Sequence, residues 1–229
     1  MHSERGECEM SNIYLVDIRE KVPREVLETF ECMLSERTKE KIKKFKFQED
    51  YYRSLYGEIL VRKIVSQQVG IRPEKINIDR NSFGKPYVKN LENIYFNISH
   101  AGDWVACVVS GSECGIDIER VGKVNLRIAE RFFHKKEYAA LINKTHENRI
   151  DYFFELWTLK ESYIKYKGKG LYIPLNSFCI TEKRGNYKAE SETEEVVFTQ
   201  YNWDSCYKIA ACTKDQVQNI IKLGINELL

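Results

Sequence analysis

The stretch SECGIDIERVG, residues 112–122, predicts both a central element of the fold and a candidate functional site. Apolar and acidic residues alternate from Ile116 to Glu119, which is the pattern of a β-strand. Successive side chains of a strand point to opposite faces, so Asp117 and Glu119 share one face. The two carboxylates repel each other unless a positive charge lies between them. A bound cation would explain the pair, and so would an exposed strand whose acids serve solubility alone.

Composition bounds the class of protein. The 229 residues are 43% hydrophobic, which suffices for one large or two small domains with a packed core. A formal net charge of +2 argues against a surface built for nucleic acid. The seven cysteines lack CxxC spacing, which predicts reduced thiols and no zinc site. Neither a signal peptide nor a run of about 18 apolar residues is present, so we expect a cytoplasmic protein that does not enter a membrane.

Working outward from the central strand, helical and strand patterns alternate in two blocks. The predicted strands are 12–18, 76–79, 95–99, 104–110, 115–119, 177–181, 195–201 and 207–212, and the predicted helices are 35–69, 126–143, 148–166 and a short one capped by Asp215. Turn residues between consecutive strands indicate mainly antiparallel sheets. The order predicts an α+β fold of two similar halves, 1–111 and 112–229, each a mainly antiparallel sheet with a long helix.

A third acid follows on the predicted helix 148–166. Glu161 and Lys165 are four residues apart and share a helix face. An ordinary salt bridge explains that spacing equally well. If Glu161 converged with Asp117 and Glu119, the three carboxylates would suit Mg²⁺, which prefers oxygen ligands. No arrangement of the four histidines supports zinc.

Three further motifs each have a structural and a functional interpretation. Ser99 and His100 are adjacent, so on a strand they face apart and do not form a nucleophile–base pair; at a strand end both could bind one phosphate. The tripeptide 84–86, GKP, reads first as a turn and lacks the spacing of a P-loop. The basic run TKEKIKKFK is commonly a solvated helix face, and a nucleic-acid footprint remains the alternative.

Taken in order, GKP, FNISH, GIDIE, RFFHKKE and LWTLKESYIKYKGKGL resemble the 4′-phosphopantetheinyl transferases, in particular the broad-specificity type. The resemblance covers about residues 35–175, and its core is G-[IV]-D-x-E followed by W-x-x-K-E-x-x-x-K. It implies an enzyme that moves the phosphopantetheine arm of coenzyme A onto a serine of apo carrier proteins and releases adenosine 3′,5′-bisphosphate. It also implies that a pseudo-twofold relates the halves and that the active site lies between them.

The resemblance further implies a role for each matched residue. The implied Mg²⁺ ligands are Asp117, Glu119 and Glu161. The implied coenzyme A contacts are Lys165 and Lys41 at the diphosphate, Ser99, His100 and Arg53 at the 3′-phosphate, and Lys85 and Pro86 along the adenine. Glu161 is the first candidate to take the serine proton and Glu137 the second, while Trp157 and Lys160 position Glu161. One departure is Thr38, which falls where close relatives have a lysine.

The implied partners are apo carrier proteins or carrier domains of peptide, polyketide or fatty-acid synthases. Their acidic helix would meet the region 167–199, including Lys167, Lys169, Leu171 and Tyr172. We expect a monomer with no nucleic-acid or membrane partner. Two rival interpretations are an Mg²⁺-dependent nucleic-acid enzyme and a non-catalytic coenzyme A-binding protein.

Overall fold

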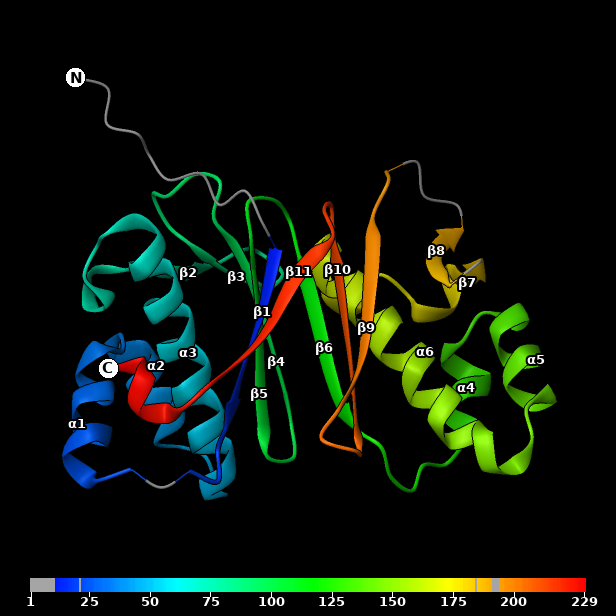
Figure 1. The fold of residues 1–229 in the computed structure, drawn as a ribbon, viewed down its shortest axis with the longest axis horizontal. Coiled ribbons are helices and arrows are strands. Elements are labelled where there is room, and N and C mark those ends of the chain that lie inside the picture. Colours follow the sequence, from blue (N-terminus) through cyan, green and yellow to red (C-terminus); the bar gives the residue numbers. More distant parts are fainter. Residues whose placement is uncertain (1–10, 21, 184, 191–193) are drawn as a thin grey trace.

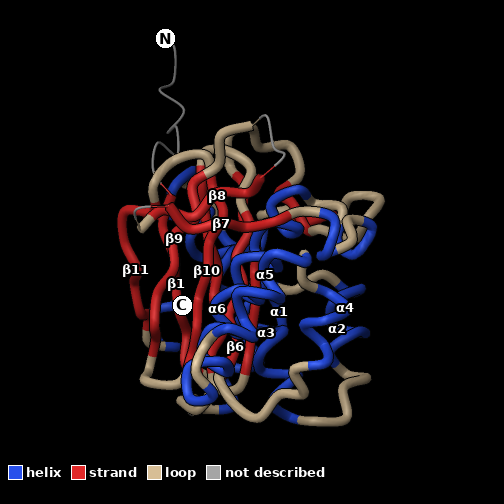
Figure 2. Tube along the Cα trace, turned by 90° about the vertical axis from the view of Figure 1, so that its right-hand side faces the viewer, coloured by secondary structure: helices blue, strands red, loops and turns tan. Residues whose placement is uncertain are grey.

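Two β-sheets pack against each other through a shared core at the centre of the molecule, with helices α3 and α6 at the two sides (Figure 1). This computed structural model describes residues 11–20, 22–183, 185–190 and 194–229. Seen from the side, the long strands gather on one side of the molecule and the helices on the other (Figure 2).

The first sheet has the strand order β11-β1-β5-β4. Its strands are β1 (Ser11–Asp17), β4 (Tyr95–Ala101), β5 (Trp104–Ser110) and β11 (Val217–Leu223). Strand β11 runs parallel to β1, and the other pairs are antiparallel. The prediction of a final helix capped by Asp215 is therefore wrong: VQNIIKL is a short apolar run that suits either structure, and pairing with β1 decides for the strand.

The second sheet has the order β6-β10-β9 and is antiparallel throughout. Its strands are β6 (Gly115–Arg120), β9 (Val197–Trp203) and β10 (Tyr207–Thr213). Two small hairpins accompany the sheets: β2 (Ile78–Arg80) with β3 (Pro86–Val88), and β7 (Cys179–Lys183) with β8 (Asn186–Glu190). The predicted α+β class with mainly antiparallel sheets is confirmed, while β3 and β8 were not predicted.

Helices α3 (Gln48–Val69) and α6 (His146–Lys167) each span 22 residues and end at a glycine in the left-handed conformation, Gly70 and Gly168. Glycine adopts this conformation without the steric cost that a Cβ atom imposes, so it is the usual residue just past a helix end. The remaining helices are α1 (Arg24–Met33), α2 (Glu36–Ile42), α4 (Arg127–Phe132), α5 (Lys135–Asn143) and the 3₁₀ turns η1 (Pro73–Lys75), η2 (Gly170–Tyr172), η3 (Leu175–Ser177) and η4 (Ile225–Leu228).

Two predicted helices are interrupted. The helix predicted over 35–69 breaks between α2 and α3, where the backbone tightens to i→i+3 hydrogen bonds at Lys44 and Phe45 and Phe47 is extended. The helix predicted over 126–143 breaks before α5, because His134 and Glu137 form a capping box that starts a new helix there. An apolar periodicity runs through both breaks, and at the second break local capping chemistry overrides it.

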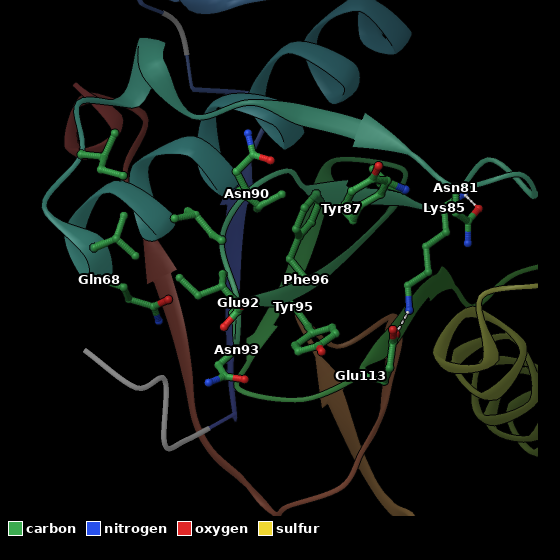
Figure 3. Close-up of a pocket in the computed structure, with 16 residues that line it drawn as sticks. Gln68, Asn81, Lys85, Tyr87, Asn90, Glu92, Asn93, Tyr95, Phe96 and Glu113 are labelled. Carbon is green, nitrogen blue, oxygen red and sulfur yellow. Dashed lines mark hydrogen bonds and ion pairs between the residues drawn. The ribbon is translucent and has the colours of Figure 1, made fainter. Parts of the chain in front are cut away.

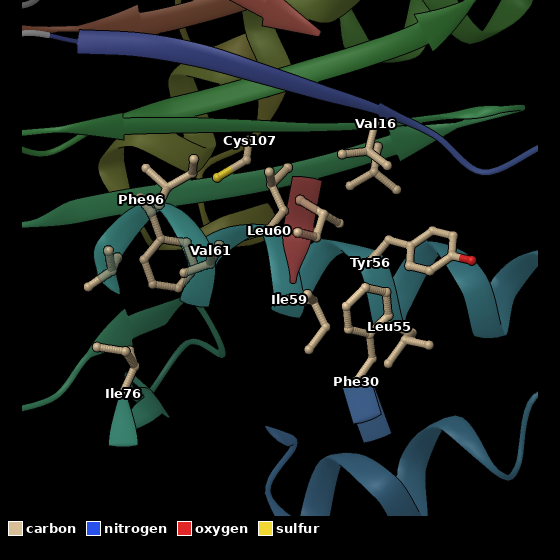
Figure 4. Close-up of a cluster of buried hydrophobic side chains, with 14 of the residues drawn as sticks. Val16, Phe30, Leu55, Tyr56, Ile59, Leu60, Val61, Ile76, Phe96 and Cys107 are labelled. Carbon is tan, nitrogen blue, oxygen red and sulfur yellow. The ribbon is translucent and has the colours of Figure 1, made fainter. Parts of the chain in front are cut away.

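The C-terminal segment of the chain packs into the core beside α3. Leu55, Ile59 and Leu60 of α3 belong to one buried cluster with Phe96 of the first sheet (Figure 4). Ile225 and Leu228 from η4 belong to the same core and are almost fully buried. The second predicted half, 112–229, therefore sends its last segment back into the core of the first.

Candidate functional site

Strand β6 lies unusually close to α6, and Gly115 allows it. A Cβ atom at Gly115 would come within 2.1 Å of the Ser162 carbonyl oxygen and 2.3 Å of the Tyr166 amide nitrogen. Contacts that short do not occur, so any side chain would push the strand away from the helix. Asp117 and Glu119 lie two and four residues further along and share the strand face of Gly115. The glycine therefore brings the acidic face of β6 against α6.

Asp117 is the centre of a network that joins three elements. Its Oδ1 accepts a hydrogen bond from Lys165 Nζ of α6 at 2.6 Å and from Ser99 Oγ of β4 at 2.9 Å. Lys165 Nζ also donates to Ser99 Oγ at 2.9 Å. The carboxylate is 3% exposed, and its second oxygen, Oδ2, is buried without a hydrogen-bond partner. A buried carboxylate oxygen without a partner is costly, so it marks a place where a cation or donor is expected.

The three predicted acids influence one another. Burial raises the pKa of the Asp117 carboxyl. Burial, and then the charge of Asp117, raise the pKa of Glu119 to about 7, while a hydrogen bond from Trp157 opposes the rise. Burial and the Asp117 charge likewise raise the pKa of Glu161. The charge of Asp117 thus acts on the carboxyls of both glutamates.

These residues fit a hard divalent cation by chemistry. The donors are carboxylate oxygens, one of which has no hydrogen-bond partner, and burial raises the pKa of all three carboxyls. Within the described part of the chain, no three acidic, histidine or cysteine side chains are already drawn together tightly enough to form a metal-binding group. The donor set is thus present, but its side chains are not gathered into a finished coordination shell.

Of the residues predicted at the 3′-phosphate, Ser99 and His100 lie near the end of β4, and Arg53 comes from α3. Desolvation by the surrounding protein, and next the positive charge of Arg53, lower the pKa of His100. Arg53 donates to the Gly102 carbonyl at 2.9 Å and pairs with Asp50 at 2.7 Å. The Ser99 hydroxyl donates to Asp117 and accepts from Lys165, and its predicted contact with the 3′-phosphate stays a prediction.

Helix α2 carries the predicted Lys41, which is exposed with its ammonium 5.8 Å from the centre of the Phe45 ring. Thr38, the departure from close relatives, has a local structural part: its amide donates to Ser35 Oγ, the N-cap of α2, at 3.2 Å. The neighbouring Lys39 pairs with Glu36 at 2.7 Å.

Lys85 and Pro86 line one end of a pocket of about 980 Å³ (Figure 3). The pocket lies between the end of α3, β3, the link from β3 to β4, and the start of β4. The acids Asp117, Glu119 and Glu161 are not part of its lining. Lys85 points out of the hairpin toward Glu113, with which it forms an ion pair at 2.7 Å.

Glu137 does not fit the predicted role of a base. Its Oε1 accepts from Lys160 Nζ at 2.7 Å and from the Ile180 amide at 2.7 Å, and its Oε2 accepts from the His134 amide at 2.8 Å. The side chains of Lys160 and Glu137 are 0% and 1% exposed. A carboxylate that is buried, paired and saturated with donors is poorly placed to receive a substrate proton. Lys160, predicted to be structural, pairs with it.

Asn97 contributes to the site although the sequence pattern was not used to predict it. Its side-chain oxygen accepts a hydrogen bond from the Ile116 amide at 2.9 Å, which ties β4 to β6 across the two sheets. Asn97 and Ser99 alternate on one face of the predicted strand 95–99, so the period-2 rule alone places both toward the same neighbour. That signal was available, because two small polar residues facing one way in a buried strand call for a polar partner.

Comparison with known proteins agrees with this geometry. The model of the family "4′-phosphopantetheinyl transferase, N-terminal" matches residues 22–112, and that of the "4′-phosphopantetheinyl transferase superfamily" matches residues 113–212. The 4′-phosphopantetheinyl transferase gsp of Aneurinibacillus migulanus is 38% identical over 225 residues, 96% of this chain and 94% of its own. The chain belongs to the 4′-phosphopantetheinyl transferase superfamily.

A second relative supports the same family. The 4′-phosphopantetheinyl transferase Sfp of Bacillus subtilis (strain 168) is 36% identical over 222 residues, which cover 95% of this chain and 99% of that one. A solved structure, the holo-[acyl-carrier-protein] synthase of Thermotoga maritima, covers 44% of this chain and 61% of its own at 19% identity and a TM-score of 0.38, too low to place any residue.

The chain is therefore an enzyme, a 4′-phosphopantetheinyl transferase that uses coenzyme A and acts on apo carrier proteins. Within the described ranges, no helix combines the length and apolar content that crossing a bilayer requires.

Proposed function

We propose that this transferase attaches phosphopantetheine to a serine of apo carrier domains of peptide, polyketide or fatty-acid synthases, releasing adenosine 3′,5′-bisphosphate. The observation that carries the proposal is the Asp117 network: a buried carboxylate holds Lys165 and Ser99 on one oxygen and leaves the other without a partner. Such a network offers the Lys165 ammonium to a negatively charged diphosphate, and it offers a free carboxylate oxygen to a metal ion bound beside that diphosphate.

Mg²⁺ is the cation proposed for this site, with Asp117, Glu119 and Glu161 as the residues that would hold it. Their carboxylate chemistry supports this, as does the orphaned Oδ2 of Asp117. When bound, Mg²⁺ supplies positive charge that offsets the negative charge of the diphosphate during phosphoryl transfer.

The cationic side chains are proposed to bind the phosphates. Lys165 lies against Asp117, and its ammonium would face the charge that develops on the leaving phosphate. Lys41 would contact the diphosphate as well, and Ser99, His100 and Arg53 would contact the 3′-phosphate. Pro86 and the aliphatic stem of Lys85 would lie along the adenine, which is supported by their place in the pocket wall.

Glu161 is the proposed acceptor of the serine proton. Burial and the neighbouring Asp117 raise the pKa of Glu161, and a base with a pKa nearer the working pH accepts a proton more readily. Glu137 is not proposed, because its two oxygens are occupied by Lys160 and backbone amides.

The carrier is proposed to meet the surface around 167–172, although residues 184 and 191–193 of the predicted docking region lie outside the described residues. Leu171 and Tyr172 support this, since they are 75% and 81% exposed and follow the basic segment that holds Lys167 and Lys169. We propose also that the enzyme works as a cytoplasmic monomer without nucleic acid or membrane; the described cysteines are free thiols, which suits a reducing compartment.

The test is the intact mass of an apo carrier protein after incubation with enzyme, coenzyme A and Mg²⁺. We expect the carrier to gain one phosphopantetheine arm, and to lose this gain with Asp117→Ala or with a chelator. Asp215→Ala, an exposed aspartate near the start of β11, is the matched control and keeps the gain. Transfer that persists in both Asp117→Ala and the chelated enzyme would remove the proposed metal site.

A further inference from the structure

The hairpin between β2 and β3 is shaped by Asn81. Its Oδ1 accepts hydrogen bonds from the amides of Phe83 and Lys85, both at 2.9 Å. Gly84 occupies the left-handed region with φ of 89°, which closes the turn. The side chain of Asn81 thus fixes the direction in which Lys85 leaves the hairpin.

The same hairpin lies against the end of α6. Asn81 Nδ2 donates to the Gly168 carbonyl at 3.1 Å. The rings of Phe83 and Tyr172 form an edge-to-face pair with centroids 5.3 Å apart. A Cβ atom at Gly168 would stand 3.1 Å from Lys85 Cδ, so the hairpin and the helix end are in close contact. A segment of the first half is therefore seated on the second half by three separate contacts.

Lys85 completes this junction with its ammonium group. Nζ donates to the Cys114 carbonyl at 3.0 Å, to the Tyr166 carbonyl at 3.3 Å and to Glu113 Oε2 at 2.7 Å. The side chain is only 13% exposed. Tyr166 lies in the last turn of α6, where carbonyls lack helical partners and attract positive charge. Cys114 immediately precedes Gly115 and the acidic strand.

We propose that Lys85 is a positioning residue, which fixes the spacing between β6 and α6 and so aligns Asp117 with Lys165. Its ammonium binds the backbone one residue before Gly115 and one residue after Lys165, at the point where the strand and helix are closest. The inference rests on the proposed function, since it assigns the spacing a role in phosphopantetheine transfer.

The alternative is that the Lys85 ammonium binds coenzyme A directly. Two of its three acceptors are backbone carbonyls that would lose a buried donor if the ammonium turned to a phosphate. The aliphatic stem remains available to a base beside Pro86. Positioning therefore depends on the ammonium group, whereas contact with a base depends on the aliphatic stem. A variant that keeps the stem and removes the charge distinguishes the two roles.

The experiment compares Lys85→Met, Asn81→Ala and the control Lys89→Met. Methionine keeps an apolar stem, and Asn81→Ala loosens the hairpin without altering the Lys85 side chain. Lys89 follows β3 and is half exposed, with its Nζ 3.6 Å from Asp79 and outside the junction. For each variant we would measure kcat and KM for coenzyme A with an apo carrier, and hydrogen–deuterium exchange of amides in 164–172.

Positioning predicts that Lys85→Met lowers kcat about ten- to a hundredfold, the loss expected from misplacing reacting groups by about 1 Å, while KM changes less than about threefold. Exchange in 164–172 becomes faster. Asn81→Ala shows both changes to a smaller extent, and Lys89→Met shows neither.

A raised KM with kcat retained would overturn the proposal in favour of direct binding, and so would a loss of kcat with exchange unchanged. If the wild type transfers no phosphopantetheine to any carrier, the proposed function fails. The exchange data still decide whether Lys85 fixes the end of α6.

Discussion

Replacing Lys160 with methionine tests whether the buried ion pair to Glu137 holds α6 in place. Lys160 Nζ donates to Glu137 at 2.7 Å and to the Phe178 carbonyl at 2.8 Å. Lys160→Met leaves the Glu137 carboxylate buried, with only backbone amides as donors. Removing one partner of a buried pair costs about 3–5 kcal/mol, because the other charge stays uncompensated. For a chain of this size, about 2–4 °C per kcal/mol gives a fall in Tm of roughly 6–20 °C.

The assay is thermal unfolding followed by circular dichroism, with activity measured well below Tm. The double variant Lys160→Met/Glu137→Gln buries no charge and should lose less stability than Lys160→Met alone. Lys39→Met is the matched control, since its partner Glu36 is 84% exposed and such a surface pair contributes at most about 1 kcal/mol.

Two results would refute this reasoning. A Tm for Lys160→Met within about 2 °C of wild type would show that the pair contributes little to stability. A Glu137→Gln enzyme with wild-type Tm and a large loss of kcat would return Glu137 to the role of base that its contacts exclude.

Three further predictions concern the strand, the acids and the end of α6. Gly115→Ala should lower both Tm and kcat, because its Cβ would meet the Ser162 carbonyl at 2.1 Å; melting curves and transfer assays check this. Burial raises the pKa of Glu119 from 4.5 to about 7, so between these values the native state keeps a proton that the unfolded chain loses. The stability of the protein in the presence of a chelator should therefore fall as pH rises across that range. Glu119→Gln should flatten the slope of Tm against pH. Gly168→Ala should cost about 1 kcal/mol or more, measured by urea unfolding, because its φ is 66° and its Cβ would press on Lys85.

The elements that the sequence predicted well are those whose pattern is local. The strand at 115–120 and the long helix around Glu161 follow from alternation and from helical spacing, and both lie within two residues of their predicted positions. The helix break before Lys135 follows from a capping box that an unbroken apolar periodicity hides. Strand β11 could not be predicted locally, because its partner β1 is about two hundred residues away along the chain.

In the candidate site too, some features follow from local sequence and others depend on contacts between distant segments. Spacing placed Asp117, Glu119 and Glu161 on one strand face and one helix face, and the structure brings those faces together. Sequence alone could not show that Ser99 donates to Asp117 or that Glu137 pairs with Lys160, because both contacts depend on which elements meet in space. Buried hydrogen bonds and ion pairs between distant elements are set by the tertiary structure.

The two halves contribute different chemistry in spite of their similar helices. In α3 the buried Arg62 is used to bond the carbonyls of Pro73 and Ile76, so its charge stabilises the fold. In α6 the C-terminal part of the helix carries Glu161 and Lys165, and Lys165 bonds to Asp117 of β6. The first half contacts this site through Ser99, which donates to Asp117, and through Lys85, which binds the backbone next to β6 and α6. Since Asp117 and Lys165 both come from the second half, these crossing contacts join the first half to their network.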